Sequence, residues 1–137
     1  MITSVIQVRN ELIQYWEDNY NSSPTLYPNS PLPDALKANP FIMFELEFIK
    51  STTVGTGTTE GTFTRHRGLM YITVNTPYGT GNKTAYTLAD ETITLLERKR
   101  IAGSISTYAG YIDTSGKSYD GEHFQVVVAV PFTTTVG

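Results

Sequence analysis

Two histidines are the residues in this sequence that most readily suggest acid–base catalysis or metal binding, because imidazole titrates near neutral pH. His66 and His123 fall on different predicted strands, and neither is followed by a second ligand at a metal-binding spacing. His123 is the better candidate because it follows Glu122 and lies close to Asp120. Folding would still have to bring these carboxylates to the imidazole. A small ligand-binding or hydrolytic α+β domain using His66 or His123 is therefore one alternative.

A pair of glutamates is the second candidate for chemistry. Glu45 and Glu47 lie at i and i+2 of a predicted strand over residues 41–50, so both point to one face of the sheet, roughly 7 Å apart. Paired carboxylates can act as general acid and base, or they can line the lumen of a ring. Nothing nearby in the sequence supports catalysis, and charge on one sheet face is ordinary patterning. A solvated outer face is the favoured interpretation.

Two stretches imitate a phosphate-binding loop. Residues 79–84 lie between a predicted strand and a predicted helix, but Asn82 stands where the motif requires glycine before the lysine. Residues 116–118 have the right ending, but the earlier glycine is replaced by Tyr111 and a strand follows instead of a helix. The sequence therefore predicts no nucleotide site, no metal site and no cofactor.

The elements that would position these residues are organised around residues 63–100. This stretch predicts a strand that ends by about Thr76, a glycine-rich turn and an amphipathic helix. The residues expected on the apolar face of that helix are Ala85, Leu88, Ala89, Thr92, Leu95 and Leu96. The basic run at residues 98–100 is expected to close the helix, where cations complement its negative end.

The remaining elements complete an α+β pattern. Ser4 and Gln7 have capping-box spacing, so a helix is expected to start near Ser4. Residues 41–50, 105–113 and 122–132 predict further strands, the last two as a closing hairpin. We therefore expect a mainly antiparallel four-stranded sheet with two helices packed on one face, in the order α-β-β-α-β-β.

Two irregular segments stand out within a single domain over residues 1–137. Residues 21–40 carry five prolines, which favours an extended connector over a helix or a central strand. Residues 51–62 are almost wholly threonine and glycine, with Val54 as the one aliphatic side chain, and predict a mobile hairpin arm that orders on assembly.

Composition narrows the classes of function. A chain of 137 residues that is 39% hydrophobic, 12% aromatic and 17% charged is typical of one folded domain. Its net charge of −3 gives no broad attraction to nucleic acid or to an anionic membrane. Cysteine is absent, so disulfides and thiolate chemistry are excluded. No segment predicts a signal peptide or a membrane-spanning helix.

Three short motifs carry a resemblance to a known family. They are the Arg-His-Arg-Gly run at 65–68, the Pro-Tyr-Gly-Thr-Gly turn at 77–81 and the Leu-Ala-Asp run at 88–90. Together with the order of the elements, they make nearly the whole chain resemble the tail terminator proteins of long-tailed phages, the lambda-like tail-completion family. The proline-rich connector and the arm depart from the family pattern.

The resemblance implies a structural virion protein and not an enzyme. It implies a homo-oligomeric ring, usually a hexamer, that caps the tail tube, stops its polymerisation and provides the head–tail joining surface. The partners would be the tail tube protein and the head-side connector protein. The location would be the head-proximal end of the tail in the virion, after assembly in the host cytoplasm. No small-molecule substrate, membrane or sequence-specific nucleic acid is implied, although DNA could pass through the ring.

The residues themselves also favour protein partners, because a sheet with apolar residues on both faces and an orderable arm suit a subunit of an assembly. The expected contacts with a neighbour, the lumen or the tail tube are Glu45, Glu47, Arg65, Arg67, Val54 and Thr58. Another head–tail connector component or a tail-tube subunit is a further alternative built on the same principles.

Overall fold

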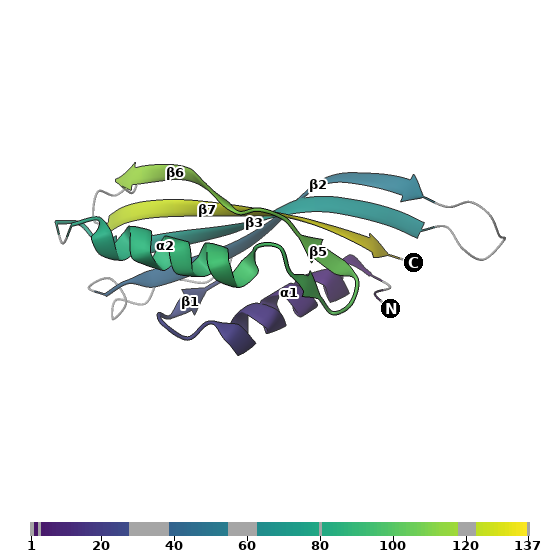
Figure 1. Cartoon of the computed structure of the whole chain (residues 1–137), viewed down its shortest axis with the longest axis horizontal. Coiled ribbons are helices and arrows are strands. Elements are labelled where there is room, and N and C mark those ends of the chain that lie inside the picture. Colours follow the sequence, from purple (N-terminus) through teal and green to yellow (C-terminus); the bar gives the residue numbers. More distant parts are fainter. Residues whose placement is uncertain are drawn as a thin grey trace.

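The computed structural model describes residue 2 and residues 4–27, 39–54, 63–79, 81–117 and 123–136. These residues form a mixed α+β fold in which two helices lie against one curved sheet (Figure 1). In chain order the elements are α1 (Val5–Asn19), β1 (Thr25–Leu26), β2 (Phe41–Val54), β3 (Phe63–Pro77), α2 (Lys83–Leu96), β4 (Arg100–Ile101), β5 (Ile105–Thr107), β6 (Tyr111–Lys117) and β7 (His123–Val136).

Helix α1 begins where the capping residues predict. Ser4 has an extended backbone, and its hydroxyl oxygen accepts a hydrogen bond from the Gln7 amide at 3.2 Å. This bond satisfies one of the N–H groups that the first turn leaves without a helical partner. One stripe of the helix is buried, formed by Val8, Leu12 and Trp16. The expected start of the first helix near Ser4 is confirmed.

The sheet is larger than the four strands expected from the sequence. Among the described residues it has seven strands in the order β1-β2-β3-β7-β5-β4, with β6 also paired to β7. The three longest strands, β2, β3 and β7, match the expectation, and the block β2-β3-β7-β6 is antiparallel. The additional strands β1, β4 and β5 contain only two or three residues each. Such short strands lack enough residues to show an alternating pattern, which explains why the sequence did not predict them.

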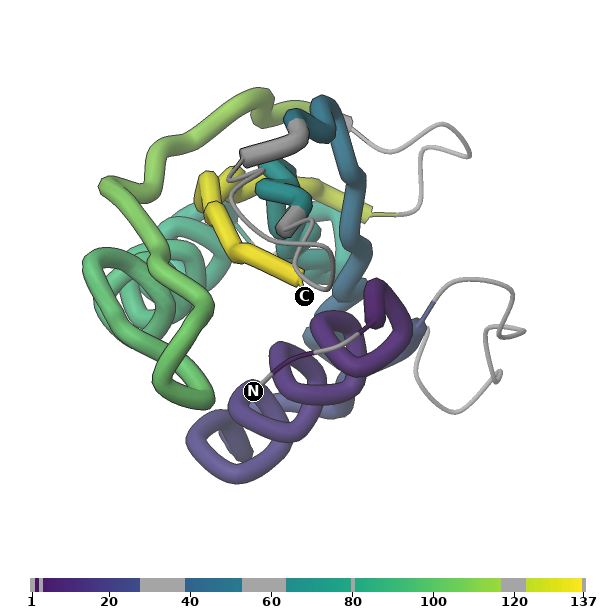
Figure 2. The backbone as a smooth tube through the Cα atoms, turned by 90° about the vertical axis from the view of Figure 1, so that its right-hand side faces the viewer, coloured from purple at the N-terminus to yellow at the C-terminus, as the bar shows by residue number. Residues whose placement is uncertain are grey.

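Both helices cover the same face of the sheet. The register aligns Ile42, Val74 and Val126 across the three central strands, and the same face continues through their even-numbered neighbours. Trp16 of α1 contacts this face at Phe44, with ring centroids 5.4 Å apart. Tyr86 of α2 contacts it at Phe124 across 6.0 Å. Figure 2 looks along the molecule and shows α1 below the curled sheet and α2 at its left.

The hydrogen bond between the Tyr15 hydroxyl and the Leu95 carbonyl oxygen, 3.1 Å long, joins the two helices directly. The residues enclosed between helices and sheet are almost all aliphatic or aromatic. Burial of this surface is the main favourable term for folding, at roughly 25 cal/mol per Å² of apolar area. The expected packing of two helices on one face is therefore what the structure has.

Strands β2 and β3 form a longer hairpin than the sequence predicts. The expected arm over residues 51–62 begins as regular strand, because residues 51–54 continue β2 and pair with residues 63–66 of β3. Residues 55–62, including Thr58, lie outside the described part of the chain. Backbone pairing explains the difference: threonine has high strand propensity, and the ladder with β3 satisfies its backbone groups.

The proline-rich connector over residues 21–40 contains one short strand. Thr25 and Leu26 of β1 pair in parallel with Ile42 and Met43 of β2. The amide of Ile42 also donates to the carbonyl of Pro24 across 2.8 Å. Residues 28–38 of the connector lie outside the described residues. An edge position suits this segment, because the prolines around it cannot donate to a central ladder.

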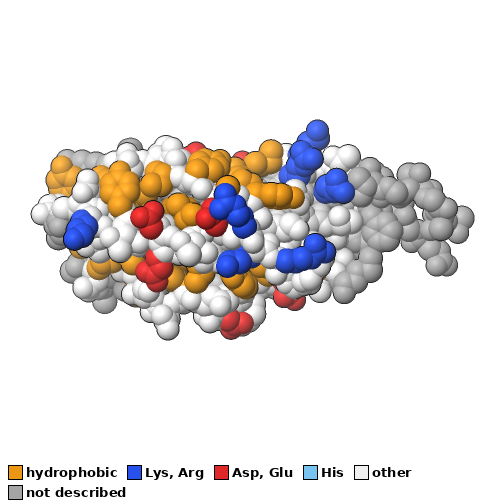
Figure 3. Space-filling model, viewed as in Figure 1, with side chains coloured by type: hydrophobic (Ala, Val, Ile, Leu, Met, Phe, Trp, Pro, Cys, Tyr) orange, Lys and Arg blue, Asp and Glu red, His pale blue; other side chains and the backbone are white. Residues whose placement is uncertain are grey.

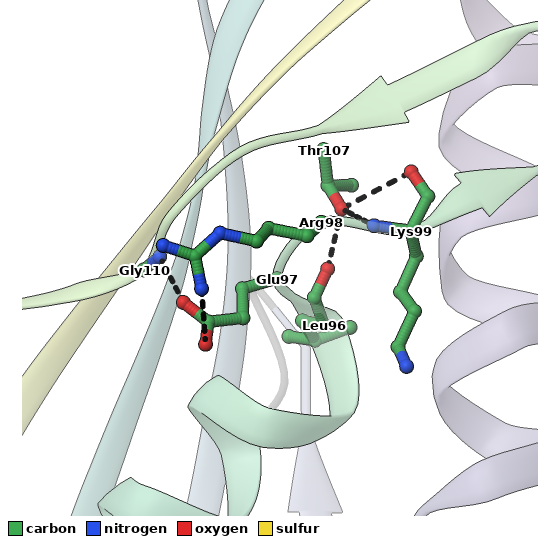
Figure 4. Close-up of polar contacts among 6 residues, drawn as sticks. All are labelled: Leu96, Glu97, Arg98, Lys99, Thr107 and Gly110. Carbon is green, nitrogen blue, oxygen red and sulfur yellow. Dashed lines mark hydrogen bonds and ion pairs between the residues drawn. The ribbon is translucent and has the colours of Figure 1, made fainter.

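Helix α2 ends earlier than expected, at Leu96, so the basic run at 98–100 does not close it. Glu97 is already extended, and Arg98 has a positive φ of 53°. The chain turns here because Thr107 binds the end of the helix (Figure 4). Arg100 therefore begins β4 on the sheet.

The closing hairpin contains three strands instead of the two expected. The predicted strand over residues 105–113 is divided into β5 and β6 by residues 108–110. At this break the Glu97 carboxylate accepts a hydrogen bond from the Gly110 amide at 3.0 Å (Figure 4). A β-carbon at Gly110 would lie only 3.1 Å from a methyl group of Val130 and 3.2 Å from one of Ile93, so the chain passes close to both side chains.

Candidate functional site

The face of the sheet that the helices leave uncovered carries most of the candidate residues. Glu45 and Glu47 of β2 are both exposed there, as the alternation of the strand predicts. Glu45 is opposite Tyr71 of β3, and Glu47 is opposite Leu69. The two carboxylates therefore form an acidic half of this outer face, beside tyrosine and leucine side chains.

Tyr71 of β3 interacts with Glu47 of β2 and with charged groups of β6. A hydrogen bond with the Glu47 carboxylate, followed by burial and the negative charges nearby, raises the pKa of the Tyr71 hydroxyl above 10.0. The other charges that contribute are those of Glu47 itself, Asp113 and Tyr111, the last two on β6. The acidic half therefore reaches from β2 across the sheet to β6.

Arg65 and Arg67 of β3 lie on the same outer face, further along the strands. Both are exposed. Arg67 is opposite Lys50 of β2 on one side and Thr133 of β7 on the other. Thr133 is opposite Ser106, and Ser106 is opposite Arg100. The register thus brings Arg67 and Arg100 into one row, which the sequence did not predict because pairing partners cannot be read from alternation alone.

Two further candidate contact residues belong to the arm expected over residues 51–62. Val54 is the last residue of β2 and pairs with Phe63 through the backbone. Thr58 lies outside the described residues. Their proposed role in contacts with a neighbour or with the tail tube therefore stays a prediction.

The histidines lie far apart on the sheet. His66 is opposite Thr134 near the start of β3, whereas His123 is opposite Pro77 at its end. The Nδ1 atom of His66 lies 2.8 Å from the Ser51 hydroxyl oxygen. Asp120 and Glu122, the carboxylates considered for His123, lie outside the described residues.

His123 is itself a buried side chain, 3% exposed, and its ring meets the edge of Phe41 with centroids 5.3 Å apart. Within the described ranges, no group of three or more histidine, aspartate or glutamate side chains is placed to hold a metal ion. The contact that the structure shows for the His123 ring is thus aromatic packing.

An apolar groove lies on the helix-covered side, between the start of α1 and β2. The residues that line it are Val5, Ile6, Arg9, Ile13, Phe44, Leu46 and Phe48. At the start of α1, Val5 and Ile6 are 40% and 60% exposed, although both side chains are aliphatic. The buried stripe of the helix begins only at Val8. Arg9 borders the groove, and its guanidinium donates to the Asn10 side chain at 3.1 Å.

No described helix is both long and apolar enough to cross a membrane.

In the view of Figure 3, most lysine and arginine side chains lie in the half of the molecule that carries β5 and the far ends of β2 and β3. The register and exposure of the outer-face residues divide that face along its strands into an acidic half around Glu47 and a basic half around Arg67.

Comparison with known proteins identifies the fold and no function. No family model matches the chain, and no curated protein sequence matches it. Among solved structures, one chain whose name states no activity is similar to it with a TM-score of 0.66. That match covers 96% of this chain and 95% of the other, at 15% sequence identity. A likeness at this identity shows a shared fold alone.

Proposed function

We propose that this protein is a structural subunit that assembles into a closed ring, and specifically a phage tail terminator. The observation that supports this proposal is a pair of open sheet edges on opposite sides of one block of strands. On one side, β1 pairs only with Ile42 and Met43, so the rest of β2 has no second partner strand among the described residues. On the other side, β6 pairs only with β7 within the same described part.

The directions of the strands suit repeated head-to-tail contact. The block β2-β3-β7-β6 is antiparallel throughout, so β2 and β6 run in opposite directions. If a second copy is rotated about an axis parallel to the strands, its β2 comes beside the first copy's β6 in an antiparallel arrangement. Such a contact uses two different patches and repeats from copy to copy. It closes into a ring when the rotation divides a full turn, and closure leaves no exposed edge.

The side chains on the two edges are consistent with a contact between proteins. Tyr111 and Ile112 of β6 are 45% and 40% exposed, so large apolar side chains are accessible at this edge. The β2 edge carries Glu45, Glu47 and the exposed Ile49. In this proposal Glu45 and Glu47 belong to the subunit contact. Arg65 and Arg67 lie on the inner strand β3 and line a surface of the ring, including its lumen.

The specific role comes from the resemblance to phage tail terminators in the runs at 65–68, 77–81 and 88–90. In that role a hexamer caps the tail tube, stops its growth and joins the head-side connector. The protein would act at the head-proximal end of the tail, with no catalytic step and no cofactor. Other head–tail connector subunits or a tail-tube subunit remain the alternative within the same proposal.

The oligomeric state of the purified chain tests the proposal. We expect light scattering coupled to size exclusion to give a discrete closed assembly, with six subunits as the terminator role requires, and negative-stain images to show rings. Added to polymerising tail-tube protein, these rings should shorten the tubes. Open-ended tubes formed by this chain alone would indicate a tube subunit instead. A strict monomer at millimolar concentration would contradict the ring.

A further inference from the structure

A polar hollow in the basic half of the outer face is lined by three arginines and by hydroxyl side chains. Arg65 and Arg67 come from β3, and Arg100 comes from β4. Ser104, Ser106 and the threonines at the end of β7 complete the lining. The register explains this convergence, because Arg67, Thr133, Ser106 and Arg100 form one row across four neighbouring strands. Lys50 extends the row by one strand beyond Arg67.

The positive charges in this row have no counter-charge within the described part of the chain. The one ion pair found there joins Arg98 to Glu97, outside the hollow. Arg100 uses its Nε atom to donate to the Gly103 carbonyl at 2.9 Å, which leaves the rest of its guanidinium available. Like charges opposite one another on neighbouring strands destabilise a sheet. A bound anion would remove that repulsion between Lys50 and Arg67.

Hydroxyl side chains lie between the arginines on the same face of the sheet. Ser106 and Thr133 occupy the positions between Arg67 and Arg100 in the row, and both are partly exposed. The Thr133 hydroxyl is paired with that of Tyr108, 2.9 Å away. A ligand that only accepts hydrogen bonds would pair with the Ser106 hydroxyl and the guanidinium groups together.

We propose that this hollow binds a phosphate group. Phosphate presents several acceptor oxygens and matches the planar fork of arginine, which can donate two parallel hydrogen bonds to it. The group can belong to free phosphate, to a nucleotide or to a nucleic-acid backbone. The length of the row favours the backbone, because Lys50 and Arg100 are four strand spacings apart, roughly 19 Å. This inference does not depend on the ring proposed above.

Fluorescence anisotropy with the full chain and a labelled twelve-nucleotide oligothymidylate tests the proposal. We expect the association constant to fall as the salt concentration increases. In a plot of log K against log salt concentration, the slope should be about −0.7 for each phosphate contacted. The variants Arg67→Gln and Arg100→Gln should each weaken binding about tenfold, the effect of losing one charge-assisted contact. Ser106→Ala should weaken binding about threefold, the lower end for a neutral hydrogen bond.

Lys99→Gln is the matched control because it removes one positive charge from the residue next to Arg100. The Lys99 side chain points away from Thr107 and the adjoining turn in Figure 4, and it is not part of the hollow's lining. We expect it to change oligonucleotide binding less than twofold. All the substituted arginines are exposed, so circular dichroism should show an unchanged fold.

Competition by inorganic phosphate and thymidine monophosphate distinguishes the sources of the group. If these competitors displace the oligonucleotide only at millimolar concentrations, the result supports a site for a nucleic-acid backbone. If they displace it in the concentration range in which the oligonucleotide itself binds, the result supports a site for a single phosphate. Both results support phosphate recognition. The proposal is overturned if none of these probes binds, or if Lys99→Gln weakens binding as much as Arg67→Gln. It is also overturned if the arginine variants change self-association alone, which would indicate carboxylates of another copy as the occupant.

Discussion

The Thr107 hydroxyl lies 2.6 Å from the Leu96 carbonyl oxygen and donates a hydrogen bond to it. The same hydroxyl oxygen accepts a hydrogen bond from the Lys99 amide at 2.7 Å. One buried side chain of β5 therefore satisfies both the last turn of α2 and the start of the turn that follows (Figure 4). This arrangement fixes where the helix ends and where β4 begins.

Thr107→Val should lower the free energy of unfolding by about 1–3 kcal/mol. Valine keeps the shape but leaves the buried Leu96 carbonyl and the partly buried Lys99 amide without their partner. Urea denaturation measures the change. Thr73→Val on β3 is the matched control, because no hydrogen bond of the Thr73 side chain is found among the described contacts, and it should change stability by less than about 0.5 kcal/mol. Equal losses for the two variants would show that Thr107 has no special role.

Gly68→Ala should destabilise the protein by about 1–3 kcal/mol, as overpacking in a core does. A β-carbon at this position would contact the Glu47 carbonyl oxygen and would lie 2.6 Å from the Phe132 ring. The carbonyl belongs to the neighbouring strand and cannot move without disturbing the ladder. Thermal unfolding followed by circular dichroism measures the loss.

Gly110→Ala is the comparison for this glycine, because its β-carbon would meet only side chains, those of Val130 and Ile93, at 3.1 and 3.2 Å. Side-chain rotation can relieve that contact, so the loss should be smaller than at Gly68. A larger loss at Gly110 would contradict the importance of the backbone approach between β2 and β3.

Tyr27 should make stability depend on pH at high pH. Burial first, and then the hydrogen bond to Glu17 at 2.9 Å and the charge of that carboxylate, raise the pKa of Tyr27 from 10.0 to about 12. The folded state therefore holds this proton more tightly than the unfolded state. Its stabilising contribution is complete below pH 10 and is lost as the pH rises from about 10 to about 12.

Tyr27→Phe should reduce the decline in stability between these two pH values, because phenylalanine keeps the packing against Phe44 and has no proton to lose. Melting temperatures across pH 8–12 measure the effect in both proteins. The ultraviolet titration should also lose its component near pH 12. Identical pH profiles for the two proteins would refute this assignment.

Thr114→Lys should weaken the proposed ring assembly, because a lysine on an exposed edge strand disfavours pairing with another strand. Thr114 is exposed on β6. We expect at least a tenfold increase in the concentration at which half the subunits assemble, with little change in the melting temperature of the subunit. Thr94→Lys, the same substitution on an exposed position of α2, should assemble normally. Normal assembly of both variants would exclude the β6 edge from the contact.

The sequence was sufficient to predict the elements whose pattern is local. The capping pair Ser4 and Gln7 predicts the start of the first helix. The alternation of apolar and polar residues around Ile42 and Phe44 identifies the face of β2 that the helices cover. Such patterns depend on neighbours a few residues apart, which the chain itself supplies. The α+β class and the long strands β2, β3 and β7 follow from them.

The basic row and the end of α2 could not be predicted, because both depend on contacts between distant residues. Arg67 and Arg100 meet only because the β3-β7-β5-β4 register aligns them. The basic residues at 98–100 suggested a helix end by their charge, yet the deciding contact comes from Thr107. Charge at a helix end contributes only about 0.3–1 kcal/mol at an exposed site, less than a buried hydrogen-bond network can.

Trp16 is the single tryptophan of the chain, and its indole N–H donates to the Thr25 hydroxyl at 3.0 Å. Its ring also stacks on Tyr20, with centroids 4.3 Å apart, and contacts Phe44. Intrinsic fluorescence therefore reports on one place, where α1, β1 and β2 meet. Detachment of the first helix would be visible as a shift in emission without any attached dye, even if the rest of the sheet stayed intact.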